Sequence, residues 1–239
     1  MNTHILNPLV TLLLLSSALH FNVAAQQKKP PTGGRIAVVV DERLSALRST
    51  PQLSGKLLRR IGRGKLVAVR GVKISRDGVV YYLVNVTSRT HGWIQREAVL
   101  SRSQSGDDLK LLSLIKGSAD FDRIVRARIF LDHFPRSPLR AEVLLILGDA
   151  AEGVGAKLAR EATRRVNEAD GSAPEFSYFL NYSGLDRYNR HGVTFVFDNS
   201  TKQFHYDGAA WREILRRFPK TVAAEEARKR LSKIVASVH

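Results

Sequence analysis

The stretch VLSRSQSGDD, residues 99–108, marks a change from the sequence pattern of strands to that of helices. Before it, short runs of β-branched and aromatic residues alternate with turn residues, a pattern that is typical of β-strands. After it, apolar residues recur at helical spacing, and Asp107 and Asp108 suit the first turn of a helix. The Ser-rich residues 101–106 therefore predict a linker between two domains, and the predicted fold class is α+β.

The residues before the linker, 35–100, predict a small β-barrel. Strand-like runs are separated by turn signals, and one of these turns contains an Asp77-Gly78 pair, which favours a hairpin. Many short strands within so few residues are typical of small barrels. The expected strands are residues 36–40, 65–70, 79–86, 93–94 and 99–100.

Five segments of this region follow one another in a characteristic order and spacing: LSALRSTP at 44–51, GKLL at 55–58, IGRGKLVAV at 61–69, YLV at 82–84 and GWI at 92–94. With these segments the region resembles bacterial SH3-like (SH3b) domains. The resemblance implies an SH3-like barrel over residues 35–100, with an aromatic groove that takes peptides or peptidoglycan stems. Tyr82 and Trp93 would form the binding edge of that groove. Residues 72–78 depart from the family, because they make the middle hairpin longer than usual.

The residues after the linker, 107–239, predict packed pairs of helices. Apolar spacing indicates one helix from Asp107, a second through residues 124–131 and a third from Ser137. The sequence GVG at 153–155 is expected to break the third helix in two, because each glycine inside a helix costs about 1 kcal/mol relative to alanine.

An internal repeat supports this arrangement. At an offset of 84 residues, FLDHFPRS at 130–137 aligns with ILRRFPKT at 214–221. Each copy predicts a helix that ends at Phe-Pro, then a Ser or Thr cap and a second helix. This resembles the tetratricopeptide-like helical hairpins of exported bacterial proteins, and the resemblance implies that residues 107–239 bind a protein partner. The wide offset predicts an insert between the two copies.

The insert, at about residues 171–207, is rich in aromatic side chains. Nine of the eighteen Phe, Trp and Tyr residues of the chain lie between Phe176 and Tyr206. Alternation at 193–197 and at 202–206 predicts a hairpin that lies on the helices. Flat rings suit a carbohydrate or peptide platform, but large rings at alternating positions are mostly buried, so we expect a small core instead.

Residues 1–25 predict a secretory signal. The apolar run at 9–19 is too short to span a bilayer of about 30 Å, and Val23-Ala24-Ala25 supplies small residues before a cleavage site after Ala25. The alternative is an N-terminal membrane anchor. Residues 26–34 predict a flexible leader, and no later segment predicts a transmembrane helix. The mature chain is therefore expected to be exported, to the periplasm or the cell exterior.

The charge and the lack of cysteine limit both chemistry and partners. The formal net charge is +16 and there is no Cys, which excludes disulfides, thiolate metal ligands and a Cys nucleophile. Residues 26–100 hold 15 Lys and Arg against 4 Asp and Glu, a net of +11, and residues 101–239 hold 23 against 18, a net of +5. The expected partners of the first part are anionic: envelope polymers such as peptidoglycan, lipid head groups or acidic proteins. Nucleic acid is expected only if the chain is not exported.

The densest basic cluster is the predicted anion-facing site. It consists of Arg59, Arg60, Arg63 and Lys65, on a predicted loop that leads into a strand. A solvated face is the alternative for these side chains. Together with the two aromatic residues of the expected groove, they are the predicted ligand-binding residues.

No catalytic motif is found, and neither a metal nor a cofactor is predicted. His191, Asp198, His205 and Asp207 cluster around the expected hairpin and could converge on a metal, but such residues in polar loops mostly cap turns. The sequence therefore predicts a non-catalytic binding or scaffolding protein of the cell envelope. The alternative is a cell-wall hydrolase whose catalytic residues lie in the insert.

Overall fold

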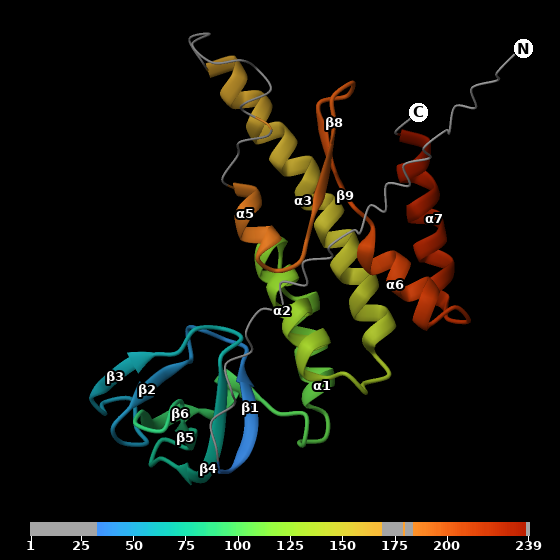
Figure 1. Ribbon diagram of the computed structural model, residues 1–239. Coiled ribbons are helices and arrows are strands. Elements are labelled where there is room, and N and C mark those ends of the chain that lie inside the picture. Colours follow the sequence, from blue (N-terminus) through green and yellow to red (C-terminus); the bar gives the residue numbers. More distant parts are fainter. Residues whose placement is uncertain (1–32, 169–178, 180–183, 238–239) are drawn as a thin grey trace, which may run out of the picture.

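The computed structural model describes residues 33–168, 179 and 184–237, and its fold is α+β (Figure 1). Within these residues a seven-stranded sheet comes first, and six helices and a two-stranded hairpin follow it. The predicted fold class is confirmed. The sheet ends at Leu100 and the first helix begins at Asp107, so the change in sequence pattern is also a change in structure. The predicted signal and most of the predicted leader lie outside the described residues.

The sheet is antiparallel and open, with β3 and β7 as its two edges. Its strand order is β3-β2-β6-β5-β4-β1-β7. The predicted closed barrel is therefore not formed, because β7 has only two residues and pairs with β1 alone before the chain turns into the first helix. The strands are β1 (Arg35–Val39), β2 (Ala46–Arg48), β3 (Leu57–Arg60), β4 (Leu66–Ile74), β5 (Val80–Asn85), β6 (His91–Gln95) and β7 (Val99–Leu100), with a short 3-10 turn, η1 (Arg96–Ala98), before β7.

The five expected strands correspond to β1, β4, β5, β6 and β7, and two more were not predicted. In the unpredicted β3 all four side chains are exposed, so its sequence does not alternate between apolar and polar. The long middle hairpin is confirmed, because β4 and β5 remain paired as far as Ile74 and Val80.

Two hydrophobic cores share strand β1. Ala37 and Val39 belong to a core within the sheet, whereas Val38 and Val40 belong to the core of the helices. Successive side chains of a strand point to opposite faces, so β1 is covered on both sides. The sheet and the helices therefore pack directly on one another, as Figure 1 shows beside β1.

The predicted linker, 101–106, is hydrogen-bonded to both parts. Ser101 is 3% exposed, and its hydroxyl donates to the carbonyl of Ile36 at 2.6 Å. The N–H of Ser101 donates to Oδ2 of Asp107 at 2.9 Å, at the start of the first helix. These bonds fasten the segment at its first residue. The independent folding of two domains stays a prediction.

The helices pack in pairs, and the third is continuous. Helix α1 packs on α2, α2 packs on α3, and α6 packs on α7. The expected break at 153–155 is wrong, because α3 continues through it for 29 residues. Among the described residues no helix combines the length and the apolar character that crossing a membrane requires. The helices are α1 (Asp107–Lys116), α2 (Asp120–His133), α3 (Arg140–Glu168), α5 (Gly184–Asn189), α6 (Ala209–Arg217) and α7 (Val222–Ser237).

The two copies of the internal repeat form the same turn. In the first copy the N–H of Ser137 donates to the carbonyl of Phe134, and in the second the N–H of Thr221 donates to the carbonyl of Phe218, both at 3.2 Å. The first turn joins α2 to α3 and the second joins α6 to α7. The predicted repeat of helix, turn and helix is confirmed.

The insert contains the predicted hairpin, which lies along α3 (Figure 1). Its strands, β8 (Phe195–Asp198) and β9 (Gln203–Tyr206), pair from Phe195 opposite Tyr206 to Asp198 opposite Gln203. Four rings of the insert are buried in the core of the helices, as expected for a core instead of a platform: Phe179, Tyr188, Phe204 and Tyr206. Phe176, Tyr178 and Tyr182 lie outside the described residues.

Candidate functional site

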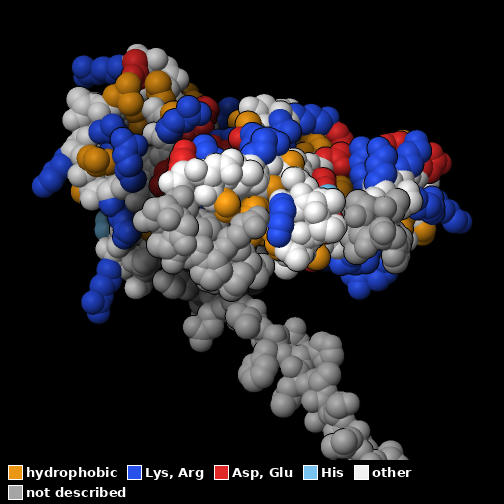
Figure 2. Space-filling view, turned by 90° about the horizontal axis from the view of Figure 1, so that it is seen from above, with side chains coloured by type: hydrophobic (Ala, Val, Ile, Leu, Met, Phe, Trp, Pro, Cys, Tyr) orange, Lys and Arg blue, Asp and Glu red, His pale blue; other side chains and the backbone are white. Residues whose placement is uncertain are grey.

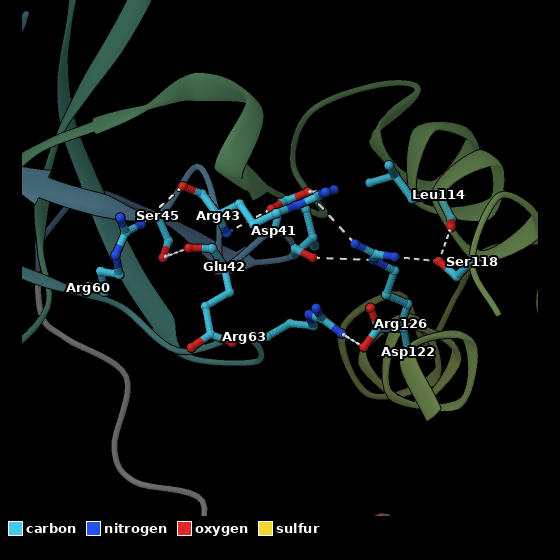
Figure 3. Close-up of polar contacts among 11 residues, drawn as sticks. Asp41, Glu42, Arg43, Ser45, Arg60, Arg63, Leu114, Ser118, Asp122 and Arg126 are labelled. Carbon is cyan, nitrogen blue, oxygen red and sulfur yellow. Dashed lines mark hydrogen bonds and ion pairs between the residues drawn. The ribbon is translucent and has the colours of Figure 1, made fainter. Parts of the chain in front are cut away.

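A cleft of about 670 Å³ opens where the sheet meets the first two helices (Figure 3). One wall comes from the loop after β1 and from the end of β3 with the turn after it. The other wall comes from the turn between α1 and α2 and from the start of α2. The lining residues are Glu42, Arg43, Arg60, Arg63, Gly117, Ser118, Ala119, Asp122 and Arg126.

Two of the arginines are placed by the turn between β3 and β4. Arg60 is the last residue of β3, and Arg63 lies in the turn that follows. Between them Ile61 is 2% exposed in the core of the sheet, and its N–H donates to the carbonyl of Ser45 at 3.2 Å. Gly64 has a φ of 78°, a conformation that favours glycine, and it lets the chain turn back into β4. The turn thereby fixes both arginines at the edge of the cleft.

Arg63 connects the sheet to α2. Its Nη1 lies 2.8 Å from Oδ1 of Asp122, and its side chain is only 17% exposed. The hydrogen bond from Arg63 is the main cause that holds the pKa of Asp122 below its ordinary value. Asp122 is therefore ionised at neutral pH and balances the charge of Arg63.

Arg126, on α2, is the most buried of the four arginines that line the cleft, with a side chain that is 9% exposed. Its Nη1 donates to the hydroxyl of Ser118, and its Nη2 lies 3.7 Å from Oδ2 of Asp41. Burial is the main cause that lowers the pKa of Arg126, and the charge of Arg63 adds to the effect. A guanidinium nevertheless remains protonated in proteins, so Arg126 carries a positive charge. The carboxylate of Asp41 balances that charge. Burial raises the pKa of Asp41, but hydrogen bonds from Arg43 outweigh it and lower the pKa overall.

Arg43 and Arg60 offer the charge that a ligand can reach. The side chain of Arg43 is 87% exposed, and its nearest carboxylate oxygen, on Asp41, is 3.5 Å away. Nη1 of Arg60 donates to the backbone carbonyl of Arg43 at 3.2 Å, and no carboxylate of the described residues pairs with Arg60. The lining holds four arginines against the carboxylates of Glu42 and Asp122, so the cleft is positive.

This arrangement suits the binding of an anion and not covalent chemistry. Guanidinium groups match the geometry of carboxylates and phosphates, and they form charge-assisted hydrogen bonds with both. Ser118 carries the one side-chain hydroxyl among the nine lining residues, and it donates to the carbonyl of Leu114 at 2.5 Å while it accepts from Arg126. A serine nucleophile needs an adjacent base, and Ser118 has none among its hydrogen-bond partners.

The predicted basic cluster is divided by the structure. Arg60 and Arg63 line the cleft, whereas Arg59 and Lys65 do not. Arg59 and Arg60 are part of strand β3, so the prediction of a loop is wrong for these two. Because successive side chains of a strand point to opposite faces, only one of the two can face the helices.

Tyr82 and Trp93 lie on neighbouring strands but not on one face. The register of β5 and β6 places Tyr82 opposite Ile94, and Leu83 opposite Trp93. Side chains that are opposite one another share a face, so the two aromatic residues point to different faces of the sheet. Neither residue lines the cleft, and the ring of Tyr82 packs against the core of the sheet. Their role in binding stays a prediction.

Of the nine lining residues the sequence indicated only Arg60 and Arg63, so two arginines of the cleft, Arg43 and Arg126, were missed. Arg43 follows two acidic residues, so no local excess of charge marks it. Arg126 lies between the buried apolar residues Val125 and Ala127 of α2, 85 positions along the chain from its partner Asp41. With Arg123 and Arg128 in the same helix, no local pattern marks Arg126 as the arginine that needs a buried partner.

The polar residues around the hairpin have separate structural roles. Asp198 accepts hydrogen bonds from Ser200 and Thr201, which lower its pKa and close the hairpin turn. Nδ1 of His205 lies 2.9 Å from Oε1 of Glu152 on α3. Within the described part of the chain, no three His, Asp or Glu side chains are placed to hold a metal ion.

The cleft thus combines two guanidinium groups that a ligand can reach with two that carboxylates hold in place. Its residues come from the sheet and from α2 and are far apart in the sequence. Comparison with protein-family models, with curated proteins and with solved structures finds no match for this chain.

Proposed function

We propose that this chain is a non-catalytic binding protein of the cell envelope, and that the cleft between the sheet and α2 holds an anionic group of a polymer such as peptidoglycan. The observation that carries the proposal is the position of Arg43 and Arg60 beside the fixed pair of Arg63 and Arg126. In this proposal the sheet is an SH3-like domain, the helices are a tetratricopeptide-like domain and the chain is exported.

The fixed arginines prepare the site before a ligand arrives. Asp122 and Asp41 hold the guanidinium groups of Arg63 and Arg126, so only the exposed side chains of Arg43 and Arg60 have to be ordered on binding. The fewer side chains a ligand has to order, the less conformational entropy is lost, which favours affinity. A carboxylate or phosphate between Arg43 and Arg60 would then complete the charge balance of the cleft.

The charge of the surrounding chain also supports an anionic ligand. Between Arg43 and Arg76 there are ten Lys and Arg residues and no Asp or Glu. On the face drawn in Figure 2, Lys and Arg side chains project at many places and acidic side chains lie among them. The general charge attracts a polyanion, and the cleft gives it a defined place.

The helical part is the proposed contact for a protein partner. No specific observation favours the alternative of a cell-wall hydrolase. The described rings of the insert are packed on α3, and the carboxylate of Asp198 is engaged in a turn.

Retention on purified peptidoglycan in a salt series tests the proposal. The experiment compares two doubly substituted chains that begin at Gln26, each with two positive charges fewer. Arg43→Ser with Arg60→Ser removes the accessible guanidinium groups of the cleft, and Arg59→Ser with Lys65→Ser is the control outside it. We expect the affinity of the cleft variant for peptidoglycan at low salt to be at least about tenfold lower than that of the unsubstituted chain, since hydrogen bonds to charged groups each contribute roughly 1.5–3 kcal/mol.

The control variant is expected to lose much less retention. Equal losses in both variants would mean that net charge and not the cleft determines binding. Unchanged retention in the cleft variant at every salt concentration would remove the cleft as the site.

A further inference from the structure

The ribbon formed by β4 and β5 extends beyond the rest of the sheet and exposes an apolar stripe. Strand β1 begins at Arg35, opposite Val69, so among the described residues β4 has only β5 as a paired strand after that point. Val72 and Ile74, on this extension, are each 65% exposed. The register places Val72 opposite Tyr82, and Ile74 opposite Val80, so the stripe runs along one face of the ribbon.

Exposed apolar side chains concentrate in the same part of the chain as the positive charge. Nine large hydrophobic side chains of the described residues are exposed, and six of them lie between residues 43 and 76, which contain no acidic residue. Single exposed apolar residues are common on protein surfaces and need no explanation. Six exposed apolar side chains within a segment that contains no Asp or Glu do need an explanation.

The ribbon itself has free positive charges beside its apolar stripe. Arg70, Lys73 and Arg76 are exposed, and none of them pairs with a carboxylate of the described residues. The one acidic residue of the ribbon is Asp77, in the turn, and it accepts a hydrogen bond from the hydroxyl of Ser75. The ribbon thus presents branched aliphatic side chains within a basic surrounding.

We propose that the β4–β5 ribbon rests on an anionic lipid surface, with Val72 and Ile74 at the boundary between head groups and acyl chains. Long basic side chains reach lipid phosphates while their aliphatic parts remain on apolar surface, so Arg70 and Arg76, two positions before Val72 and two after Ile74, fit this position. Lys73 lies between Val72 and Ile74 in β4 and points to the other face, so it adds only to the general positive charge of the ribbon. Neither Val72 nor Ile74 lines the cleft described above, so the apolar stripe is a separate feature of the surface. A deformable apolar layer with negative head groups matches both the stripe and the charge.

This inference goes beyond the cleft and is independent of it. Attachment of the ribbon to a membrane surface would leave the cleft free for its own ligand. Two aliphatic side chains and three cations give weak and reversible attachment, as is typical of peripheral proteins that combine a small apolar contact with a basic patch. Binding is therefore expected to need both negative lipid and low salt.

Co-sedimentation with lipid vesicles tests the proposal, with chains that begin at Gln26 and so retain every described residue. We expect binding to vesicles that contain phosphatidylglycerol, and little binding to vesicles of phosphatidylcholine alone. Val72→Thr with Ile74→Thr keeps the β-branched shape but removes apolar surface, and is expected to weaken binding roughly tenfold. Val196→Thr with Val222→Thr is the matched control, because these side chains are 54% and 77% exposed and lie outside the ribbon.

A second pair of variants distinguishes the effect of charge in the ribbon from the effect of the net charge of the chain. Arg70→Ser with Arg76→Ser should weaken binding more than Arg216→Ser with Lys220→Ser, which removes the same charge from α6 and the turn after it. The proposal fails if wild-type chain binds both kinds of vesicle equally, or if the ribbon variants bind like their controls. It also fails if the ribbon variants instead abolish self-association in sedimentation velocity, which would identify a second copy of the chain as the partner. The cleft variants should behave here like the charge control, so the two proposals can fail separately.

Discussion

Gly155 of α3 lies directly against the backbone of β9, at the carbonyl of Phe204. A Cβ atom on Gly155 would stand 2.4 Å from that oxygen, and 3.5 Å from Cδ1 of Phe195. One turn earlier, Oε2 of Glu152 accepts the N–H of Tyr206 at 2.8 Å. The helix therefore lacks a side chain where the hairpin comes closest, and it holds the hairpin by a carboxylate beside that point.

This contact predicts opposite effects for two glycines of one helix. Gly153→Ala places its Cβ in open space and should stabilise the chain by about 0.5–1 kcal/mol, because alanine favours helix. Gly155→Ala should destabilise it by roughly 1–3 kcal/mol, because the new methyl group forces the hairpin away from α3. Urea denaturation gives both free energies of unfolding. A shift of the same sign in both variants would contradict the close contact at Phe204.

The same glycines show why sequence reasoning misplaced a boundary. Propensity is a local property, and two glycines within three positions locally favour a break in the helix. The need for Gly155 comes from β9, about 50 residues later, and no local pattern contains that information. The fold class and the repeat could be predicted because alternation and helical spacing are themselves local.

The site was only partly predictable for a similar reason. Arg60 and Arg63 are close in sequence and belong to an obvious basic cluster. Arg43 and Arg126 come from other elements and meet them where the end of the apolar run 36–40 reaches α2, as the bond from Nε of Arg126 to the carbonyl of Val40 at 3.5 Å shows. A signal for that packing was present, because the apolar run at 36–40 has no polar face and such strands are mostly covered on both sides.

The two turns of the repeat should respond to loss of their hydroxyl caps. Oγ of Ser137 accepts the N–H of Leu139 at 3.2 Å and donates to Asp108 on α1 at 2.8 Å. Oγ1 of Thr221 accepts the N–H of Ala224 at 3.3 Å and donates to the carbonyl of Phe218 at 2.8 Å, both within its own turn. We expect Ser137→Ala and Thr221→Ala each to cost about 1 kcal/mol, with the larger loss at Ser137, which also connects to α1.

Thermal and urea denaturation measure these differences. The control is Ser232→Ala, since that hydroxyl bonds only within α7 and its removal should change stability by less than about 0.5 kcal/mol. A larger loss for Thr221→Ala than for Ser137→Ala would show that the link to Asp108 is unimportant.

Two partly buried histidines predict a loss of stability in mild acid. Burial is the main cause that lowers the pKa of His133 and of His191 below 6.5, and Arg128 and Arg190 add to the effect at His191. A histidine whose folded pKa is depressed binds fewer protons folded than unfolded, so its contribution is complete above pH about 6.5 and is lost as the pH falls through the folded pKa. Stability should therefore decrease from pH about 7 to about 5.

Substitution identifies the groups responsible. His133→Gln with His191→Gln should flatten the dependence of unfolding free energy on pH in this range, and His91→Gln, at an exposed position, should leave it unchanged. An unaltered slope in the double variant would assign the dependence to other groups.

The two tryptophans report on the sheet and the helices separately. Trp93 lies in β6, and Trp211 is 1% exposed in the core of the helices. Val38 and Val40 join the sheet to that core, and Arg63 and Arg126 connect the two parts across the cleft. We therefore expect the sheet and the helices to unfold in one cooperative transition.

Trp93→Phe leaves only the helical reporter, and Trp211→Phe leaves only the reporter in the sheet. In each variant, urea curves from fluorescence and from far-ultraviolet circular dichroism should coincide, whatever the stability lost through the substitution. Independent domains joined by a flexible segment at 101–106 would give two midpoints in at least one variant, because circular dichroism is dominated by helices while Trp93 follows the sheet. Separate midpoints would show that the packing across β1 is too weak to couple the two parts, and coincident midpoints would show that the cleft lies within one cooperative unit.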